Sequence, residues 1–254
     1  MNADASLATP ITAFPVVALV GNPNCGKTAL FNALTGGRQK VANYPGVTVE
    51  KKIGRVTTPA GRSLQIVDLP GTYSLRARSP DEEITRDAVL GQLRGEAAPD
   101  LIVCVADASN LRLALRLALE LKRVGRPVML SLNMMDIARR RGIEIDAGRL
   151  ARDLGVPVVS SVAVRRGGTD ALLSEIDSML AGLPAAGASS WSAPGAGELR
   201  NTQREADRLL AVAVRGSGER DAGTARIDSI LLHPVAGLVI LLAILFVMFQ
   251  AVFA

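Results

Sequence analysis

The chain has 254 residues, of which 48% are hydrophobic, 21% charged and 3% aromatic, and this composition excludes a disordered or collagen-like protein. It leaves room for one or two packed domains. The net charge is only +5, and the basic residues are spread along the chain without interleaved aromatic residues. We therefore expect a solvated surface and no nucleic-acid partner.

Apolar segments of strand length alternate with segments of helical pattern along the first 180 residues. Strands are expected at 14–20, 64–69, 101–107, 127–133 and 156–162. Helices are expected to begin near Thr28, Asp81, Asn110 and Thr169. Residues 41–50 are expected to form a loop. This alternation predicts an α/β fold with a mostly parallel sheet flanked by helices on both faces.

The segment 111–123 (LRLALRLALELKR) is ambiguous, because leucine recurs at every second position as it would in a strand. Arg112, Arg116, Glu120 and Arg123, however, are spaced as one polar stripe of a helix, and every residue in the segment is a good helix former. The segment is therefore predicted to be a helix.

A change of composition after Leu180 marks the end of the first domain. We assign residues 1–182 to a nucleotide-binding domain, 183–197 to a linker rich in small residues, and 198–226 to a small helical segment with a helix over 198–214. Residues 235–254 carry no charge and as a helix would be ~30 Å long, about one bilayer core. We therefore expect 227–254 to begin the first of several membrane helices.

The positions of the arginines and cysteines indicate the cellular compartment of the globular part. Five arginines lie between 204 and 226, before the apolar segment, which places the globular part on the cytoplasmic side. Cys25 and Cys104 lie in unrelated segments and cannot form a disulfide framework or a zinc site, in keeping with a reducing cytosol. The apolar segment 14–20 follows no basic region and is interpreted as a strand, not a signal peptide.

The segment GNPNCGKT fits the phosphate-binding pattern G-x-x-x-x-G-K-[ST] at every fixed position, between a predicted strand and a predicted helix. Glycines at 21 and 26 allow backbone N–H groups to surround phosphate oxygens at a helix N-terminus. Lys27 is expected at the β- and γ-phosphates and the Thr28 hydroxyl at Mg²⁺. The residues expected in this loop are Gly21, Asn22, Pro23, Asn24, Cys25, Gly26, Lys27 and Thr28.

Three further motifs follow in the order that a GTPase requires. DLPG (Asp68, Leu69, Pro70, Gly71) offers a carboxylate for Mg²⁺ and a glycine N–H for the γ-phosphate. NMMD (Asn133, Met134, Met135, Asp136) offers a carboxylate that can accept from N1–H and the 2-amino group of guanine. Thr48, in the loop between the phosphate-binding segment and DLPG, could place a hydroxyl on Mg²⁺. Together the four motifs predict a P-loop GTPase fold.

The segments GNPNCGKTALFNALTG, NYPGVTVE, VDLPGTYSL, ADASNL and LNMMDIA resemble the FeoB family of bacterial ferrous-iron transporters. In that family a cytosolic GTPase domain, and a small helical domain resembling a guanine-nucleotide dissociation inhibitor, precede a polytopic membrane region. The resemblance is dense over 16–181 and includes 227–237. It implies a GTP-binding and GTP-hydrolysing domain at the inner membrane, with Fe(II) handled only by membrane segments.

The resemblance also implies roles for individual residues. Asn24 would ligate K⁺, and Lys27, Thr48 and Gly71 would act with it in catalysis. The first switch would comprise Gly46, Val47, Thr48, Val49 and Glu50, and the second would begin at Asp68–Gly71. Thr28, Thr48 and Asp68 would hold Mg²⁺, and the partners would be GTP and GDP. Association into a homo-oligomer is left open.

Two departures from the usual GTPase pattern bear on specificity and rate. The base loop carries Val162, Ala163 and Val164, with Ala163 where a serine is usual, so that one hydrogen bond of ~1 kcal/mol is lost and ATP is left open as a second substrate. Thr72 follows DLPG in place of a water-orienting glutamine, which predicts slow hydrolysis stimulated by K⁺. The alternatives are a membrane-tethered regulatory GTPase without a role in metal transport and a non-catalytic nucleotide-binding module.

Overall fold

The computed structural model describes residues 14–37, 39–44, 47, 49–182, 191–216 and 231–253. Its centre is a seven-stranded sheet of order β2-β3-β4-β1-β5-β6-β8. The strands are β1 (Val16–Gly21), β2 (Gln39–Asn43), β3 (Glu50–Thr57), β4 (Ser63–Asp68), β5 (Leu101–Asp107), β6 (Val128–Asn133) and β8 (Val158–Ser160). β3 alone runs opposite to the other six strands, so that its pairings with β2 and β4 are antiparallel and the other four pairings are parallel. The predicted mostly parallel sheet is confirmed.

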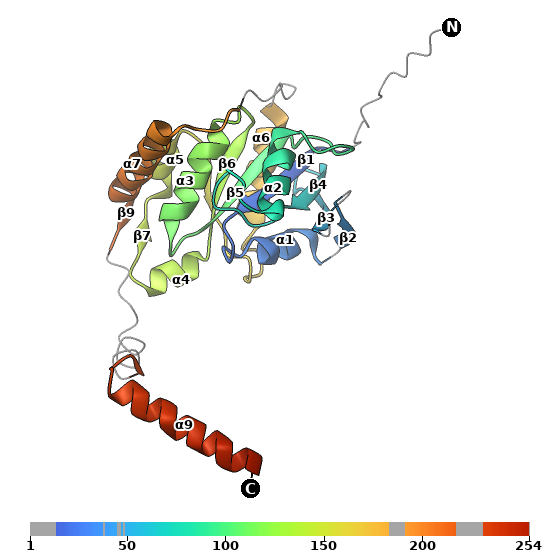
Figure 1. The fold of residues 1–254 in the computed structure, drawn as a ribbon. Helices are drawn as coiled ribbons and strands as arrows, with labels where there is room; N and C mark the ends of the chain where they lie inside the picture. The colour runs from blue at the N-terminus through green and yellow to red at the C-terminus, as the bar shows by residue number, and fades with distance from the viewer. Residues whose placement is uncertain are drawn as a thin grey trace.

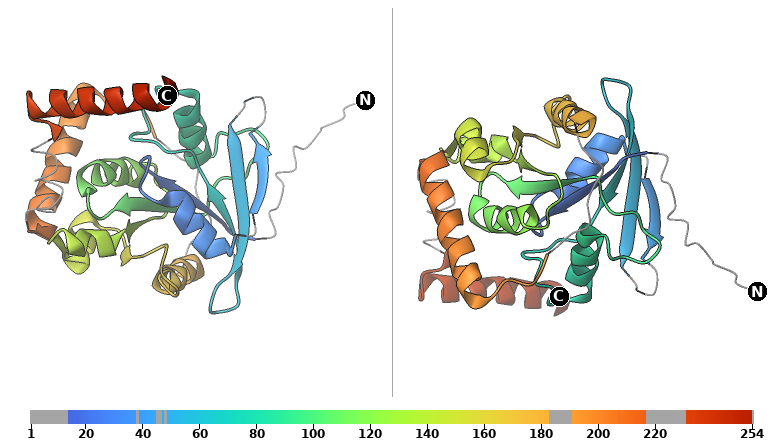
Figure 2. Two further views of the ribbon diagram at one scale, coloured as in Figure 1. Left: turned by 90° about the horizontal axis from the view of Figure 1, so that it is seen from below. Right: turned by 90° about the horizontal axis from the view of Figure 1, so that it is seen from above.

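Alternate residues of β1 enter two separate hydrophobic cores, because successive side chains of a strand point to opposite faces. Val17 and Leu19 pack with α1 (Lys27–Thr35) and α6 (Asp170–Gly182) on one face. Val16, Ala18 and Val20 belong to the core on the other face. Helices that contribute to this second core are α2 (Pro80–Leu90), α3 (Leu111–Lys122), α4 (Met135–Arg140), α5 (Ala147–Leu154) and α7 (Ala196–Ala213). Both faces are covered, as Figures 1 and 2 show.

The ambiguous leucine-rich segment is the helix α3, as predicted. Its expected polar stripe is wrong at one position, because Glu120 is 2% exposed. The Glu120 carboxylate accepts hydrogen bonds from the backbone N–H of Leu75 (2.7 Å) and the Ser74 hydroxyl (2.8 Å). These contacts satisfy a buried charge that the sequence pattern alone would place in solvent.

The predicted loop at 41–50 is wrong at both ends, because β2 extends to Asn43 and β3 begins at Glu50. All five residues of β2 are exposed, and β3 carries four charged side chains, so neither has the apolar alternation of a half-buried strand. The two strands form by backbone pairing outward from β4. β2 is the edge strand and β3 its neighbour, and the polar composition of β2 is typical of a sheet edge.

The predicted helix at 198–214 is α7, which packs against α3 and α5 at the end of the molecule away from β2 and β3 (Figure 2). It is followed by the short strand β9 (Val214–Arg215), which pairs with β7 (Glu144–Ile145). The remainder of the predicted helical segment, and residues 183–190 of the predicted linker, lie outside the described residues. Trp191, within that linker, packs against the core.

The predicted membrane span at 227–254 contains the uncharged helix α9 (Ala236–Phe253). Among the residues that the structure describes, no helix is both long and apolar enough to cross a membrane, so the expected span is not confirmed by the structure. The helix has 18 residues, against about 20 for a typical bilayer core.

Candidate functional site

The segment between β1 and α1 has the backbone geometry of a phosphate-binding loop. Asn24 and Gly26 have positive φ values of 65° and 78°, a region that asparagine and glycine adopt most readily. A Cβ on Gly21 would lie 2.5 Å from the Val105 carbonyl oxygen, and one on Gly26 would lie 2.4 Å from Nδ2 of Asn133. The loop therefore requires glycine at both positions, and it leaves the N–H groups of the first turn of α1 without helical partners.

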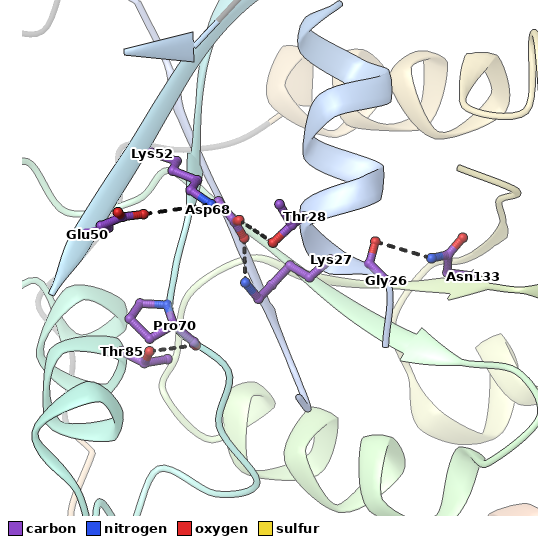
Figure 3. A network of polar contacts seen from close by, with 9 residues as sticks. All are labelled: Gly26, Lys27, Thr28, Glu50, Lys52, Asp68, Pro70, Thr85 and Asn133. Atoms are coloured by element: carbon purple, nitrogen blue, oxygen red, sulfur yellow. Dashed lines mark hydrogen bonds and ion pairs between the residues drawn. The ribbon is translucent and has the colours of Figure 1, made fainter. Parts of the chain in front are cut away.

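Lys27, Thr28 and Asp68 meet where β1 and β4 end, as Figure 3 shows. The Lys27 ammonium pairs with Oδ1 of Asp68, and the Thr28 hydroxyl donates to Oδ2 at 2.9 Å. Lys27 is 9% exposed and Asp68 6%, so the two charges are largely removed from solvent. A hydroxyl and a carboxylate at this distance are the hard oxygen donors that Mg²⁺ prefers, so the residues present fit that ion.

Hydrogen bonds hold the DLPG segment and Thr72, which follows it, to the phosphate loop and to α2. The Thr72 N–H donates to the Gly21 carbonyl oxygen (3.0 Å), and Asn22 Nδ2 donates to the Thr72 carbonyl oxygen (3.3 Å). The Thr85 hydroxyl of α2 donates to the carbonyl oxygen of Pro70 (2.9 Å; Figure 3), and Leu69 is buried in the core. Gly71 lies against Pro23, since a Cβ on it would be 3.2 Å from that ring. The loop that follows β1 and the loop that follows β4 are therefore in direct contact.

Thr72, singled out because it replaces a water-orienting glutamine, is fully buried. Its hydroxyl donates to the Ser74 carbonyl oxygen at 2.7 Å. A buried side chain with this partner shapes the backbone of the segment that follows DLPG.

The predicted first switch is described only in part. Gly46 and Thr48 lie outside the described residues. Val47 is 39% exposed, and its N–H donates to the Tyr44 carbonyl oxygen (3.3 Å). The Tyr44 N–H in turn donates to the Val49 carbonyl oxygen (3.0 Å), and Glu50 is the first residue of β3. Backbone hydrogen bonds thus join Tyr44, which precedes the segment, to Val47 and Val49 within it.

Asn133 connects the phosphate loop to the predicted base loop. Its Nδ2 donates to the carbonyl oxygens of Cys25 (3.1 Å) and Gly26 (3.4 Å), while its Oδ1 accepts from the N–H of Ala163 (3.2 Å). The sequence motif places Asn133 near the base but gives no sign of this connecting role, because all three partners are backbone groups distant in sequence.

The other residues of the predicted base site surround the start of α4. Met134 caps the helix with φ 60°, Met135 is buried, and the Asp136 side chain is 34% exposed beside Arg140 (3.8 Å). Val162 accepts the Arg165 N–H within a tight loop, and Val164 is 85% exposed. The Asp136 carboxylate is therefore open to a ligand at the edge of the site.

Cys25 is a buried thiol within the phosphate loop, 2% exposed. Burial raises its pKa from 9.0 to about 11, although Lys27 lowers it in part. Above pH 9 the unfolded chain ionises this thiol while the folded chain keeps the proton, so stability falls as pH rises and the loss ends near the folded pKa.

We therefore expect the free energy of unfolding to fall between pH 9 and pH 11, with Cys25 contributing up to about 2–3 kcal/mol. Cys25→Ser removes the ionisable group, so its unfolding free energy, measured by urea denaturation, should fall less steeply over this range. Equal slopes for the two proteins would contradict the assignment.

Comparison with known proteins identifies the family. The family model for Ferrous iron transport protein B, covering its N-terminal region, matches residues 15–176. The chain belongs to the FeoB family. The Fe(2+) transporter FeoB of Salmonella typhimurium is 47% identical over 165 residues, and that of Escherichia coli K12 is 46% identical. The aligned region is 63% of this chain and 21% of each relative, so the chain spans about a fifth of the length of these FeoB proteins.

Solved FeoB structures share the fold. The cytosolic domain of T. maritima FeoB in a GDP form has a TM-score of 0.70 and 30% identity, and the match covers 80% of this chain and 100% of that one. The G domain of T. maritima FeoB has a TM-score of 0.59 and 44% identity, covering 66% of this chain and 99% of that one. The fold is therefore the P-loop GTPase fold of FeoB cytosolic domains.

Proposed function

We propose that this chain binds GTP with Mg²⁺, hydrolyses the γ-phosphate, and serves as the cytoplasmic nucleotide switch of an Fe(II) transporter in the bacterial inner membrane. The observation that carries the proposal is the convergence of Lys27, Thr28 and Asp68 at the ends of β1 and β4. The FeoB relatives are named as Fe(2+) transporters, which supports iron as the transported ion.

The roles of the site residues follow from their chemistry. The phosphate loop would surround the β- and γ-phosphates with N–H donors, and Lys27 would add a positive charge. Thr28 and Asp68, with Thr48, would hold Mg²⁺, which neutralises charge on the phosphate oxygens when bound. The Gly71 N–H would contact the γ-phosphate. Binding of nucleotide and Mg²⁺ would separate Lys27 from Asp68, which gives the second switch two alternative sets of contacts.

We further propose that K⁺ accelerates a slow intrinsic reaction. Asn24 is an exposed residue of the phosphate loop, and its amide has no hydrogen bond to any described residue, so the oxygen can ligate a cation. A cation there would supply the charge that an arginine finger supplies in other GTPases.

Turnover at saturating GTP and Mg²⁺ should be ~10-fold or more faster in potassium buffer than in sodium buffer. Asn24→Ala should remove this difference and leave the sodium rate within about threefold of wild type. Asn201→Ala, an exposed asparagine on α7, serves as the control and should retain the potassium response. Equal rates in the two buffers for the wild type would overturn the role of K⁺.

ATP is a second candidate substrate, because Ala163 lacks the side-chain donor usual in this loop and its N–H is directed to Asn133. Loss of one hydrogen bond of ~1 kcal/mol weakens discrimination about fivefold. Turnover of GTP and ATP, measured side by side, tests the nucleotide assignment. ATP hydrolysis faster than GTP hydrolysis would refute a guanine switch, and no hydrolysis of either would refute the enzyme.

A further inference from the structure

A cavity of about 160 Å³ is lined by Tyr44 and Lys51, which flank the first switch in sequence, and includes no residue of the phosphate loop. Its walls come from β1, β4, α2 and the connection from α2 to β5. Small and apolar side chains dominate them, among them Ala18, Val67, Leu69, Ala88 and Ala97. A cavity of about 150 Å³ with apolar walls is large enough to bind a six-membered ring such as benzene.

Tyr44 lines this cavity and supplies the observation that points to a ligand. The side chain is 3% exposed, and its hydroxyl has no hydrogen-bond partner among the described residues. A buried donor left unpaired costs about 1–3 kcal/mol. Burial raises the pKa of this phenol well above its usual range, and the carboxylates of Glu96 and Asp68 raise it further, so the hydroxyl stays protonated and acts as a donor.

The charges beside the cavity are already paired. Lys51, 8% exposed, forms an ion pair with Glu96, and its ammonium lies 5.7 Å from the centroid of the Tyr44 ring. A charged molecule would compete with this pair and lose its own hydration, whereas an uncharged molecule would not. The chemistry of the walls therefore selects a neutral, mostly apolar ligand with one hydrogen-bond acceptor.

We propose that this cavity binds a small uncharged molecule of about one ring that carries a single acceptor, such as a carbonyl, and that its occupancy holds Tyr44 in place. The Tyr44 N–H donates to the Val49 carbonyl oxygen and its carbonyl oxygen accepts from the Val47 N–H, so a fixed Tyr44 restrains these two residues of the first switch. The site is thus a regulatory one. Its effect on nucleotide turnover rests on the proposed function, but its binding does not.

The probes are acetophenone and α-methylstyrene, which have nearly the same shape. The carbonyl oxygen of acetophenone, which can accept a hydrogen bond, is replaced by a CH₂ group in α-methylstyrene. Dissociation constants are measured by titrating the 254-residue chain and following its amide resonances. The ratio of the two dissociation constants, that of α-methylstyrene divided by that of acetophenone, should be about fivefold larger in wild type than in Tyr44→Phe. This is the effect of one hydrogen bond of ~1 kcal/mol. Ala88→Leu, which fills the cavity, should abolish binding of both probes, while Ala211→Leu on the exposed face of α7 should not.

Hydrogen exchange tests the link to the switch without any measurement of GTP turnover. With acetophenone at ten times its dissociation constant, exchange of the Tyr44 and Val47 amides should slow ~10-fold in wild type, because opening must first release the probe. It should be unchanged in Ala88→Leu. The proposal is overturned if neither probe binds wild type, if Ala88→Leu binds both as well as wild type does, if Tyr44→Phe leaves the preference unchanged, or if bound probe leaves exchange unaltered.

Discussion

Replacing Lys27 by alanine is expected to lower the rate of GTP hydrolysis by ~10²–10³-fold, the effect of removing one preorganised donor at a site of developing charge. The ammonium lies at the end of β1, where the Asp68 carboxylate holds it in position. Lys27 is the only lysine of the phosphate loop, residues 21–28. The measurement is single-turnover hydrolysis at saturating GTP and Mg²⁺.

Two further variants separate loss of chemistry from loss of fold. Lys40→Ala removes an exposed lysine from β2 and should hydrolyse GTP at the wild-type rate. Lys27→Arg keeps a positive charge near Asp68 but replaces a compact ammonium by a planar guanidinium, so it should fold and remain impaired. Hydrolysis by Lys27→Ala within threefold of wild type would contradict the proposed role.

Replacing Asp136 by asparagine is expected to weaken GTP binding by ~10²-fold or more and to create binding of xanthosine triphosphate. Guanine offers two donors, N1–H and the 2-amino group, to the two oxygens of a carboxylate, and hydrogen bonds to a charged group contribute ~1.5–3 kcal/mol each. Xanthine has a carbonyl in place of the 2-amino group, and an asparagine amide can donate to it. Competition against a fluorescent nucleotide measures both affinities.

The control for this exchange is Asp153→Asn, an exposed aspartate on α5, which should bind GTP as the wild type does. Because the contact of Asp136 with Arg140 at 3.8 Å is the one ion pair or hydrogen bond of its side chain within the described part of the chain, its replacement should leave the melting temperature nearly unchanged. Unaltered GTP affinity, with no gain for the xanthine nucleotide, would show that the base binds elsewhere.

The order of strands and helices could be predicted from the sequence where apolar pattern and length agree. The three central strands β1, β5 and β6 are nearly continuous apolar runs, as strands covered on both faces must be. β2 and β3 could not be predicted in this way, because their stability comes from backbone pairing to the edge of β4, which a single sequence does not display. Glu120 was misplaced for a related reason, since its partners, Ser74 and Leu75, are distant along the chain.

The part of the candidate site that comes from a single sequence motif could be predicted. Gly21, Gly26, Lys27 and Thr28 lie within eight residues, and their backbone geometry follows from their spacing. The contacts between motifs were not predictable, because they depend on which strand ends become neighbours in the sheet. The pairing of Lys27 with Asp68 and the burial of Thr72 are of this kind.

The two-sided hydrogen bonding of Asn133 has a consequence for the energetics of recognition. Its amide group holds the phosphate loop by Nδ2 and the base loop by Oδ1, so a displacement of one loop is opposed by the other. We therefore expect that occupying one end of the site orders the other end in advance, so that the two halves of the nucleotide bind with a favourable coupling free energy. Pyrophosphate and nucleoside, bound separately, would not have that coupling.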